Sequence, residues 1–218
     1  MSIYEERPEP VKKETAPKED INFELRTHTE SPYAQLSDIL SVQLEFEDSV
    51  IYLNDEITEH TLVDLMIRIR RLLQFRETKD YKGQKNDPIN LMINSPGGEI
   101  HEMMGIIDYL NSLNIKINTI CRGKAFSAAA VILTLGSGTR MMSRNSTIMF
   151  HQASSMISGK LTDVTATVDF VKKVEQDIYT MLSEKTKKDA GWWKDHMRSD
   201  LYLTADKALE YGVIDQII

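Results

Sequence analysis

From Phe46 to the C-terminus, short apolar runs rich in β-branched residues alternate with longer segments in which apolar residues recur every three or four positions. The short runs predict buried strands, and the longer spacing predicts amphipathic helices. We expect strands over residues 50–53, 89–93, 115–121, 147–151, 201–204 and 213–218. We expect helices over residues 62–73, 103–110, 127–136, 161–181 and 205–211. Strands that alternate with helices in this way predict a single α/β domain.

The ends of these helices carry residues suited to capping. Thr58 or Thr61 is expected to cap the first helix and Thr204 the last, because a threonine hydroxyl can accept a hydrogen bond from a free N–H of the first turn. Gly136 and Gly212 are placed to end the helices before them, since glycine readily adopts the left-handed conformation that follows many helices.

The N-terminal residues have a different character. Residues 1–32 hold eight acidic side chains, five basic side chains and four of the six prolines. Such a composition buries too little apolar surface to offset the entropy of ordering. It predicts a disordered or mobile arm over residues 1–37 and a folded domain over residues 38–218. A second polar segment, residues 76–87, contains Gly83 and predicts a loop.

The composition narrows the classes of function. With 218 residues, the chain is long enough for one domain with a substantial core. A formal net charge of −7 provides no basic surface for a phosphate backbone, which argues against nucleic acid as a partner. No run approaches the ~20 apolar residues of a membrane-spanning helix, and no export signal is visible. The single cysteine, Cys121, lies in an apolar run, so we expect a buried thiol and a reducing, cytoplasmic location.

Three residues that suit nucleophilic catalysis lie at the ends of predicted strands. Ser127 stands at a strand-to-helix corner, His151 closes one apolar strand and Asp200 opens another. A serine hydroxyl needs a base, and the base needs a third group that orients it. Taken one at a time, the ordinary interpretations are a helix N-cap for Ser127, a core histidine for His151 and a turn residue for Asp200.

A glycine pair follows another predicted strand, in the sequence Ser95-Pro96-Gly97-Gly98. The ordinary interpretation is a turn in which glycine supplies a positive φ. The catalytic interpretation is a backbone without side chains that brings N–H donors close to a developing oxyanion.

No sequence pattern points to a metal or cofactor. The Walker A, dinucleotide-binding and Cys/His signatures are absent from the sequence, which predicts that the chain binds no ATP, NAD or zinc. Apart from His151, the histidines have polar neighbours and no metal-binding spacing. We expect them at the surface: His28, His60, His101 and His196.

Four separated blocks occur in the order found in one known family, and from Asp38 to Ile218 the chain resembles the proteolytic subunit of the Clp protease, ClpP. The blocks are Ile93-Asn94-Ser95-Pro96-Gly97-Gly98, the Gly-x-Ala-x-Ser corner ending at Ser127, Met149-Phe150-His151-Gln152, and the segment 208–215. The resemblance implies a crotonase-like ββα superhelix with a protruding handle helix, which the long helix predicted from residue 161 would form.

The resemblance also implies an activity and partners. It implies a serine endopeptidase with Ser127 as nucleophile, His151 as base and Asp200 as the residue that orients the base. The backbone N–H groups of Gly98 and Ala128 would form the oxyanion hole. It further implies a heptameric ring, single or stacked in pairs, around an internal chamber. An AAA+ unfoldase such as ClpX or ClpA would use ATP and deliver unfolded polypeptide.

The chain departs from the family pattern at several positions. Ala153 replaces a proline of the substrate groove, and Ser199 replaces an arginine used in contacts between rings. Asn90 and Met92 stand where aromatic residues commonly help to dock the unfoldase. Such divergence suits a virus-encoded or accessory member, acting in the cytoplasm of its own cell or of an infected host.

Three other functions remain open. A phage capsid-maturation (prohead) protease would use the same triad on one scaffold substrate without an unfoldase. A ClpR-like structural subunit would be catalytically silent, which an intact triad argues against. A crotonase-type acyl-CoA enzyme would share the fold, but the Ser, His and Asp blocks argue against it.

Overall fold

The computed structural model describes residues 45–154 and 158–218, and the arm predicted over residues 1–37 lies outside the described residues. Its strands form one mostly parallel sheet: β1 (Val50–Leu53), β2 (Ile89–Ser95), β3 (Ile117–Phe126), β4 (Arg140–Met142), β5 (Thr147–Phe150), β6 (Leu201–Leu203) and β7 (Gln216–Ile217). Its helices are α2 (Glu59–Phe75), α3 (Ile100–Ser112), α4 (Ala128–Thr134), α5 (Leu161–Lys185), α6 (Ala190–His196) and α7 (Ala205–Tyr211). The chain therefore has the α/β architecture that its hydrophobic pattern predicts.

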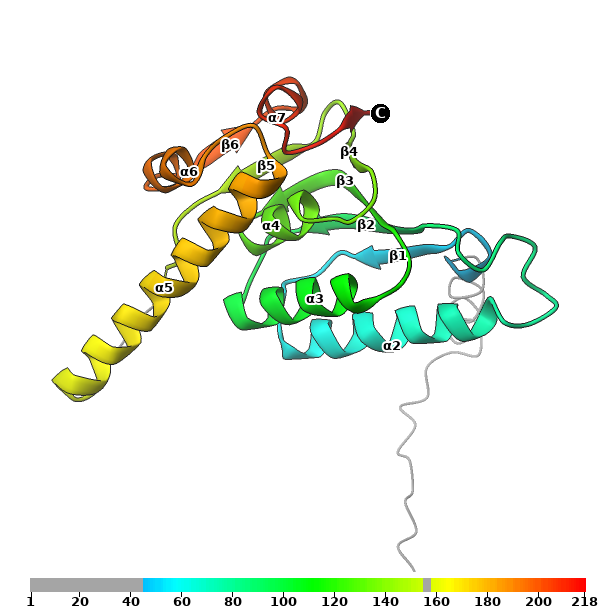
Figure 1. The fold of residues 1–218 in the computed structure, drawn as a ribbon, viewed down its shortest axis with the longest axis horizontal. Coiled ribbons are helices and arrows are strands. Elements are labelled where there is room, and N and C mark those ends of the chain that lie inside the picture. The colour runs from blue at the N-terminus through cyan, green and yellow to red at the C-terminus, as the bar shows by residue number, and fades with distance from the viewer. Residues whose placement is uncertain (1–44, 155–157) are drawn as a thin grey trace, which may run out of the picture.

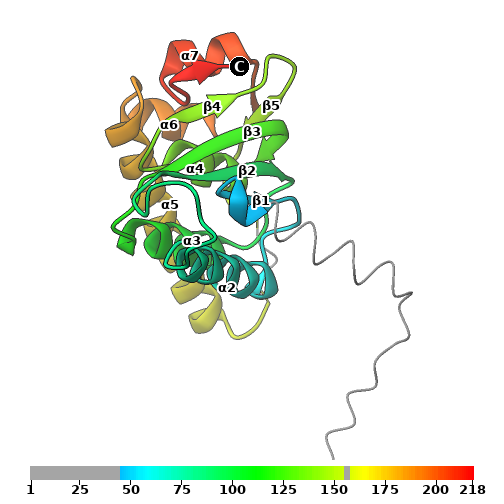
Figure 2. The ribbon, with the colours of Figure 1, turned by 90° about the vertical axis from the view of Figure 1, so that its right-hand side faces the viewer.

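Strand β3 is the branching point of the sheet (Figures 1 and 2). The main path runs β1-β2-β3-β4-β7, and every pair along it is parallel. The first half of β3 pairs with β4, whereas the second half pairs with β5, with Phe126 opposite Met149. β5 then pairs with β6 in antiparallel register, with Phe150 opposite Leu201. The carboxyl ends of β3 and β5 thus lie side by side, at the edge where α/β sheets commonly place ligands.

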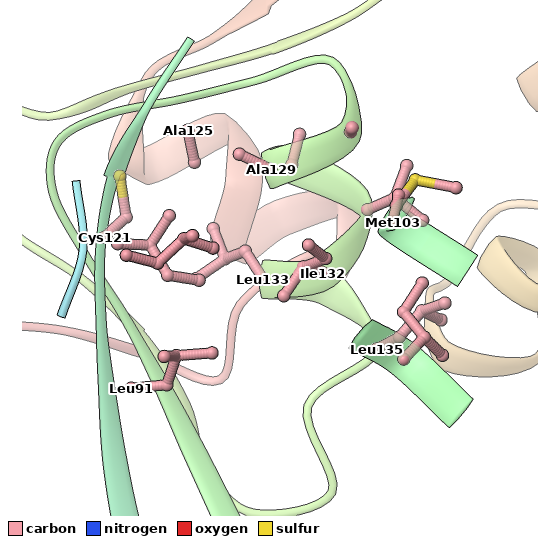
Figure 3. Close-up of a cluster of buried hydrophobic side chains, with 14 of the residues drawn as sticks. Leu91, Met103, Cys121, Ala125, Ala129, Ile132, Leu133 and Leu135 are labelled. Carbon is pink, nitrogen blue, oxygen red and sulfur yellow. The ribbon is translucent and has the colours of Figure 1, made fainter. Parts of the chain in front are cut away.

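Helix α4 lies within the hydrophobic core. Its seven residues are all buried, as expected of a helix that is apolar on every face. Figure 3 shows Ala129 and Leu133 of α4 between the strand that carries Cys121 and Met103 of α3. Because α4 begins directly after Ser127, this packing fixes the position of the candidate nucleophile.

Helix α5 projects from the domain, with its N-terminal end farthest from the sheet (Figure 1). Its buried residues, Ile178, Tyr179 and Leu182, all belong to its C-terminal part. The projecting part exposes 81 % of Leu161 and 51 % of Phe170. No helix within the two described ranges is both long enough and apolar enough to cross a membrane.

At the N-terminal side of the site, one strand boundary differs from the sequence prediction and one predicted cap is confirmed. β3 continues beyond Cys121 to Phe126, because its second half finds a partner in β5. Thr58 rather than Thr61 caps α2, since the Thr58 hydroxyl accepts a hydrogen bond from the Thr61 N–H.

The other helix ends show two confirmed positions and one correction. Gly212 ends α7 in the left-handed conformation, with φ +75°, as predicted. Thr204 is the N-cap residue of α7, as predicted, although its side chain makes no capping hydrogen bond. Gly136 does not end α4, whose C-cap is Leu135 with φ −91°. Two short elements, β4 and α6, were not predicted, and each is too short to leave a periodic signal.

Candidate active site

Ser127 joins β3 to α4 in a backbone conformation that is rare for residues other than glycine. Its φ is +54° and its ψ is −121°, and such strained positions persist only where the surrounding structure enforces them. Its N–H donates a hydrogen bond of 2.7 Å to the carbonyl of Met149, and its carbonyl accepts from the N–H groups of Ala130 and Val131. The corner is therefore fixed from both β5 and α4, and it presents Ser127 to the main cavity.

The Ser127 hydroxyl faces His151. The distance from Ser127 Oγ to His151 Nε2 is 2.7 Å, and β5 sets it by pairing with the end of β3. The hydroxyl makes no capping bond to α4, so the N-cap interpretation of this side chain is wrong. When Nε2 accepts the serine proton, the neutral imidazole carries its own proton on Nδ1. The two side chains thus have the contact required of a nucleophile and its general base.

Asp200 lies one residue beyond the paired part of β5 and β6, and its side chain makes no hydrogen bond with Ser127 or His151. It immediately precedes β6, and one further step of the pairing of Phe150 with Leu201 would place Asp200 opposite His151. Its side chain is exposed, does not border the cavity, and makes no hydrogen bond or ion pair with any other described residue. The structure therefore brings Ser127 and His151 together and leaves the Asp200 carboxylate apart from them.

Gly98 and Ala128, the two oxyanion donors expected from the resemblance, border the same cavity as Ser127. Gly98 pairs with Ile57 through its flanking residues: Ile57 N–H donates to the Gly97 carbonyl, and Glu99 N–H donates to the Ile57 carbonyl, both at 2.8 Å. A Cβ on Gly98 would lie 2.2 Å from the Ile57 oxygen, so only glycine fits. The N–H groups of Gly98 and Ala128 have no acceptor among the described residues, and both residues border the cavity.

The cavity beside Ser127 has a volume of about 560 Å³. Buried and mainly apolar side chains form its floor: Met103, Val131, Ile178, Tyr179 and Met197. Burial raises the pKa of Tyr179, while its interaction with the Gln152 side chain acts in the opposite direction. Carboxylates stand around the cavity: Glu56, Glu99 and Glu175. A site with this floor and border has room for side chains of a bound peptide.

Several residues of this cavity were not found by sequence reasoning. His101 is exposed, as are His60 and His196, but it also borders the cavity and stacks on Phe170, with ring centroids 5.8 Å apart. For the cavity residues of α5, helical spacing could have been the signal in the sequence, because residues three and four apart lie on the same face of a helix. Glu175 and Tyr179 share a face with the core residues of the same helix. His28 lies outside the described residues.

The remaining candidate groups have structural roles. Cys121 is buried, and this burial raises the pKa of its thiol to about 12, which confirms the predicted buried strand thiol. Among the residues that the structure describes, no three His, Cys, Asp or Glu side chains are grouped so that they could hold a metal ion.

Comparisons with known proteins place the chain among a group of relatives. A protein-family model described as Clp protease matches residues 32–218. The ATP-dependent Clp protease proteolytic subunit 1 of Corynebacterium glutamicum is 32% identical over 193 residues, which cover 88% of this chain and 85% of the relative. The corresponding subunit of Bacteroides thetaiotaomicron is 31% identical over 173 residues, covering 78% and 74%. Subunit 1 of Prochlorococcus marinus is 33% identical over 172 residues, covering 78% and 84%.

Proposed function

The chain belongs to the Clp protease family, and from this membership we propose that it is a serine endopeptidase whose nucleophile is Ser127. The observation that carries the proposal is the 2.7 Å contact between Ser127 Oγ and His151 Nε2 at the border of the cavity. Family membership supports a peptidase of the Clp type, and the geometry supports the serine mechanism.

In the proposed mechanism, His151 Nε2 takes the hydroxyl proton as Ser127 Oγ attacks the peptide carbonyl. The resulting oxyanion accepts hydrogen bonds from the N–H groups of Gly98 and Ala128, each worth roughly 3 kcal/mol in comparable sites. His151 then protonates the leaving amine, which leaves an acyl group on Ser127. A water molecule, deprotonated by His151, attacks this ester and releases the second product.

Asp200 completes the proposed triad after a local rearrangement. Directly opposed residues of an antiparallel pair have Cβ atoms about 5 Å apart. Extending the β5–β6 pairing by one step would therefore bring the Asp200 carboxylate within reach of the Nδ1 proton of His151. The carboxylate would then hold the ring orientation that Ser127 needs and stabilise the imidazolium that forms.

The proposal extends to the fold and the assembly. We assign the domain to the crotonase-like ββα superhelix, supported by the successive units β1–α2, β2–α3 and β3–α4. The exposed apolar residues Leu161 and Phe170 support α5 as a handle that contacts other subunits of a ring. An AAA+ unfoldase of the ClpX or ClpA kind would use ATP to feed the chamber, and the complex would act in the cytoplasm.

Active-site labelling tests the proposed chemistry. A fluorophosphonate should modify Ser127 alone, and both Ser127→Ala and His151→Ala should abolish labelling because the nucleophile or its base is gone. Ser112→Ala and His196→Ala, in exposed or helix-terminal positions outside the cavity, serve as matched controls. Labelling at the full rate in His151→Ala would refute the assignment of the base. Absence of labelling in the wild-type protein would favour a silent structural subunit.

A degradation assay tests whether this chain only cleaves polypeptides and a separate AAA+ protein unfolds them. The purified chain should cleave short unstructured peptides without ATP and leave a stable folded protein intact. Addition of an AAA+ unfoldase and ATP should make that protein degradable, as followed on a gel. Rapid digestion of the folded protein by this chain alone would contradict an enclosed chamber and favour a capsid-maturation protease.

A further inference from the structure

The cavity beside Ser127 is bordered by carboxylates and by no lysine or arginine of the described chain. Glu56 and Glu99 are exposed, and neither carboxylate makes a hydrogen bond or ion pair with another described residue. Negative charges that have no cation of their own produce a negative potential at the entrance of the cavity.

The three carboxylates reach the cavity from three separate elements. Glu56 precedes α2, Glu99 directly follows the oxyanion donor Gly98, and Glu175 lies on α5. The Oε1 atom of Glu175 accepts a hydrogen bond of 2.9 Å from the N–H of Ala153, two residues after His151. This bond fixes the Glu175 carboxylate next to the segment that carries the general base. Negative charge is therefore contributed to the border of this cavity by three separate parts of the chain.

The floor of the cavity has a different chemistry from its border. Met103, Val131 and Ile178 are buried and apolar, so they favour an apolar side chain of the substrate. Tyr179 is only 3 % exposed, and its hydroxyl lies near the Gln152 side chain but forms no well-aligned hydrogen bond with any described residue. A buried hydroxyl without a good partner is costly, and a polar atom of a bound peptide could supply one.

We propose that this cavity selects polypeptide segments that carry lysine or arginine beside the apolar residue at the scissile bond. The apolar side chain of the residue whose carbonyl is attacked lies on the floor, and the basic side chains of its neighbours reach Glu56, Glu99 and Glu175. This inference rests on the proposed function, because it assumes that a peptide bond is presented to Ser127.

The expected preference is moderate and depends on salt. A single exposed ion pair changes binding by a small factor, about two- to fivefold, and three such contacts together give about a tenfold effect. Charges near the surface are screened over about 10 Å at 0.1 M salt. High salt should therefore weaken the preference for basic flanking residues. A preference for the apolar residue at the scissile bond would not weaken with salt.

A set of matched quenched-fluorescence peptides provides the test. All contain leucine at the cleaved position, and the flanking residues are lysine in one peptide, glutamine in the second and glutamate in the third. We expect kcat/KM to decrease in that order, with about a tenfold difference between the first and third peptides at low salt. Equal values, or a preference for glutamate, would overturn the inference while the cleavage itself would uphold the proposed function.

Charge-neutral variants identify the residues responsible. The triple variant Glu56→Gln, Glu99→Gln, Glu175→Gln keeps the oxygen acceptor at residue 175 and should bring the lysine-to-glutamate ratio of kcat/KM close to one. The control triple variant Glu59→Gln, Asp177→Asn, Glu184→Gln removes the same charge from positions that do not border the cavity. The control variant should retain most of the wild-type lysine-to-glutamate ratio of kcat/KM. If both variants lose it equally, the overall charge of the chain is responsible and the cavity is not.

Binding separates the inference from the catalytic proposal. Fluorescein-labelled versions of the three peptides are titrated into Ser127→Ala, and anisotropy reports affinity without turnover. Tighter binding of the lysine peptide supports the preference even if the wild-type protein fails to cleave any peptide, which would count against the proposed function alone. Equal affinities of the three peptides would overturn the preference whatever the activity.

Discussion

The Ser127 corner and the Asp200 end of β6 carry two parts of the same proposed site, yet they are held very differently. Ser127 is fixed through backbone hydrogen bonds to β5 and α4 and through its side-chain contact with His151. Asp200 is exposed, and its carboxylate bonds to no other described residue. The contrast shows that the neighbouring strands β3 and β5 bring Ser127 and His151 together within one chain, whereas the position of the proposed orienting residue depends on the short strand β6.

The difference follows from the number of neighbours that each strand has. β3 has partners on both sides along its length, and α4 packs beneath it, so a displacement of Ser127 would disturb several elements at once. β6 has three residues and, among the strands of the described residues, pairs only with β5. Short edge strands with few hydrogen bonds open at low free-energy cost. A contact from another subunit or from substrate could therefore complete the site by shifting β6.

The largest effect should come from Asp200→Asn. If Asp200 orients His151 in the working enzyme, this change should lower kcat/KM by about 10²- to 10⁴-fold, because the amide cannot stabilise the imidazolium. Steady-state hydrolysis of a fluorogenic peptide measures the loss. Asp195→Asn, an exposed position in α6, is the matched control and should stay within twofold of wild type. Activity of Asp200→Asn near the wild-type value would mean that the site works as a Ser-His pair.

Gly97→Ala should have the next largest effect, because it changes a residue packed against the firmly held Ser127 corner. A Cβ there would lie 2.5 Å from the carbonyl oxygen of Phe126 and 2.8 Å from the Cβ of Ser127, and the φ of Gly97 is +92°. The corner must move, and a displacement of about 1 Å in an active site commonly costs about 100-fold in rate. Peptidase and labelling rates report it. Gly191→Ala, where the nearest heavy atom is 3.2 Å away, should change them less than twofold.

The sequence predicted the well-fixed region better than the edge. The corner at Ser127 and the position of His151 at the end of β5 follow from breaks in the hydrophobic pattern, which are local signals, although β3 ends at Phe126 and not at the predicted Cys121. The position of Asp200 depends on how far the β5–β6 pairing extends, and the border of the cavity depends on which face α5 presents to it. Both are properties of tertiary packing, so the sequence indicated Asp200 as a candidate but not its separation from His151, and it missed Glu175 and Tyr179.

A third prediction concerns the stability of the C-terminal segment that follows Asp200 in the chain. The Arg140 guanidinium, only 11% exposed as a side chain, donates to the carbonyls of Lys185 and Gly212 and pairs with Asp215. It thereby connects β4 to the ends of α5 and α7. Arg140→Met should reduce the free energy of unfolding by about 2 kcal/mol, because these acceptors lose a charged donor. Denaturant titration measures this loss.

The same variant sharpens the comparison of the two regions. Hydrogen exchange should increase more over residues 200–218 than over residues 123–131, since the one side-chain bond from Arg140 to α4 that is described goes to the Thr134 carbonyl, at the end of the helix away from the corner. Arg144→Met is the matched control: the Arg144–Asp206 pair is exposed on both sides, and its loss should cost about 0.5 kcal/mol or less. A uniform increase in exchange over both ranges would show that the two regions unfold as one unit. The Ser127 corner would then not be held more firmly than the C-terminal segment.

The smallest effect should be the pH dependence contributed by Asp215. Its hydrogen bonds with Arg140 hold the pKa of this carboxyl below its ordinary value. The contribution to stability is therefore fully present above the ordinary aspartate pKa of about 3.9 and is lost as the pH falls through the lower pKa of the folded state. Unfolding by urea between pH 6 and pH 3 should show the wild-type protein more stable than Asp215→Asn, with a gap that narrows toward the acid end. In an Arg140→Met background the gap should be smaller and should depend less on pH, because the guanidinium, the largest cause of the lowered pKa, is absent, while the N–H of residue 140 and Lys185 still lower it. A gap that widens toward low pH, or that persists unchanged without Arg140, would show that Asp215 stabilises the C-terminal region by some other contact, and the connection from β4 to the end of α7 would then not rest on this ion pair.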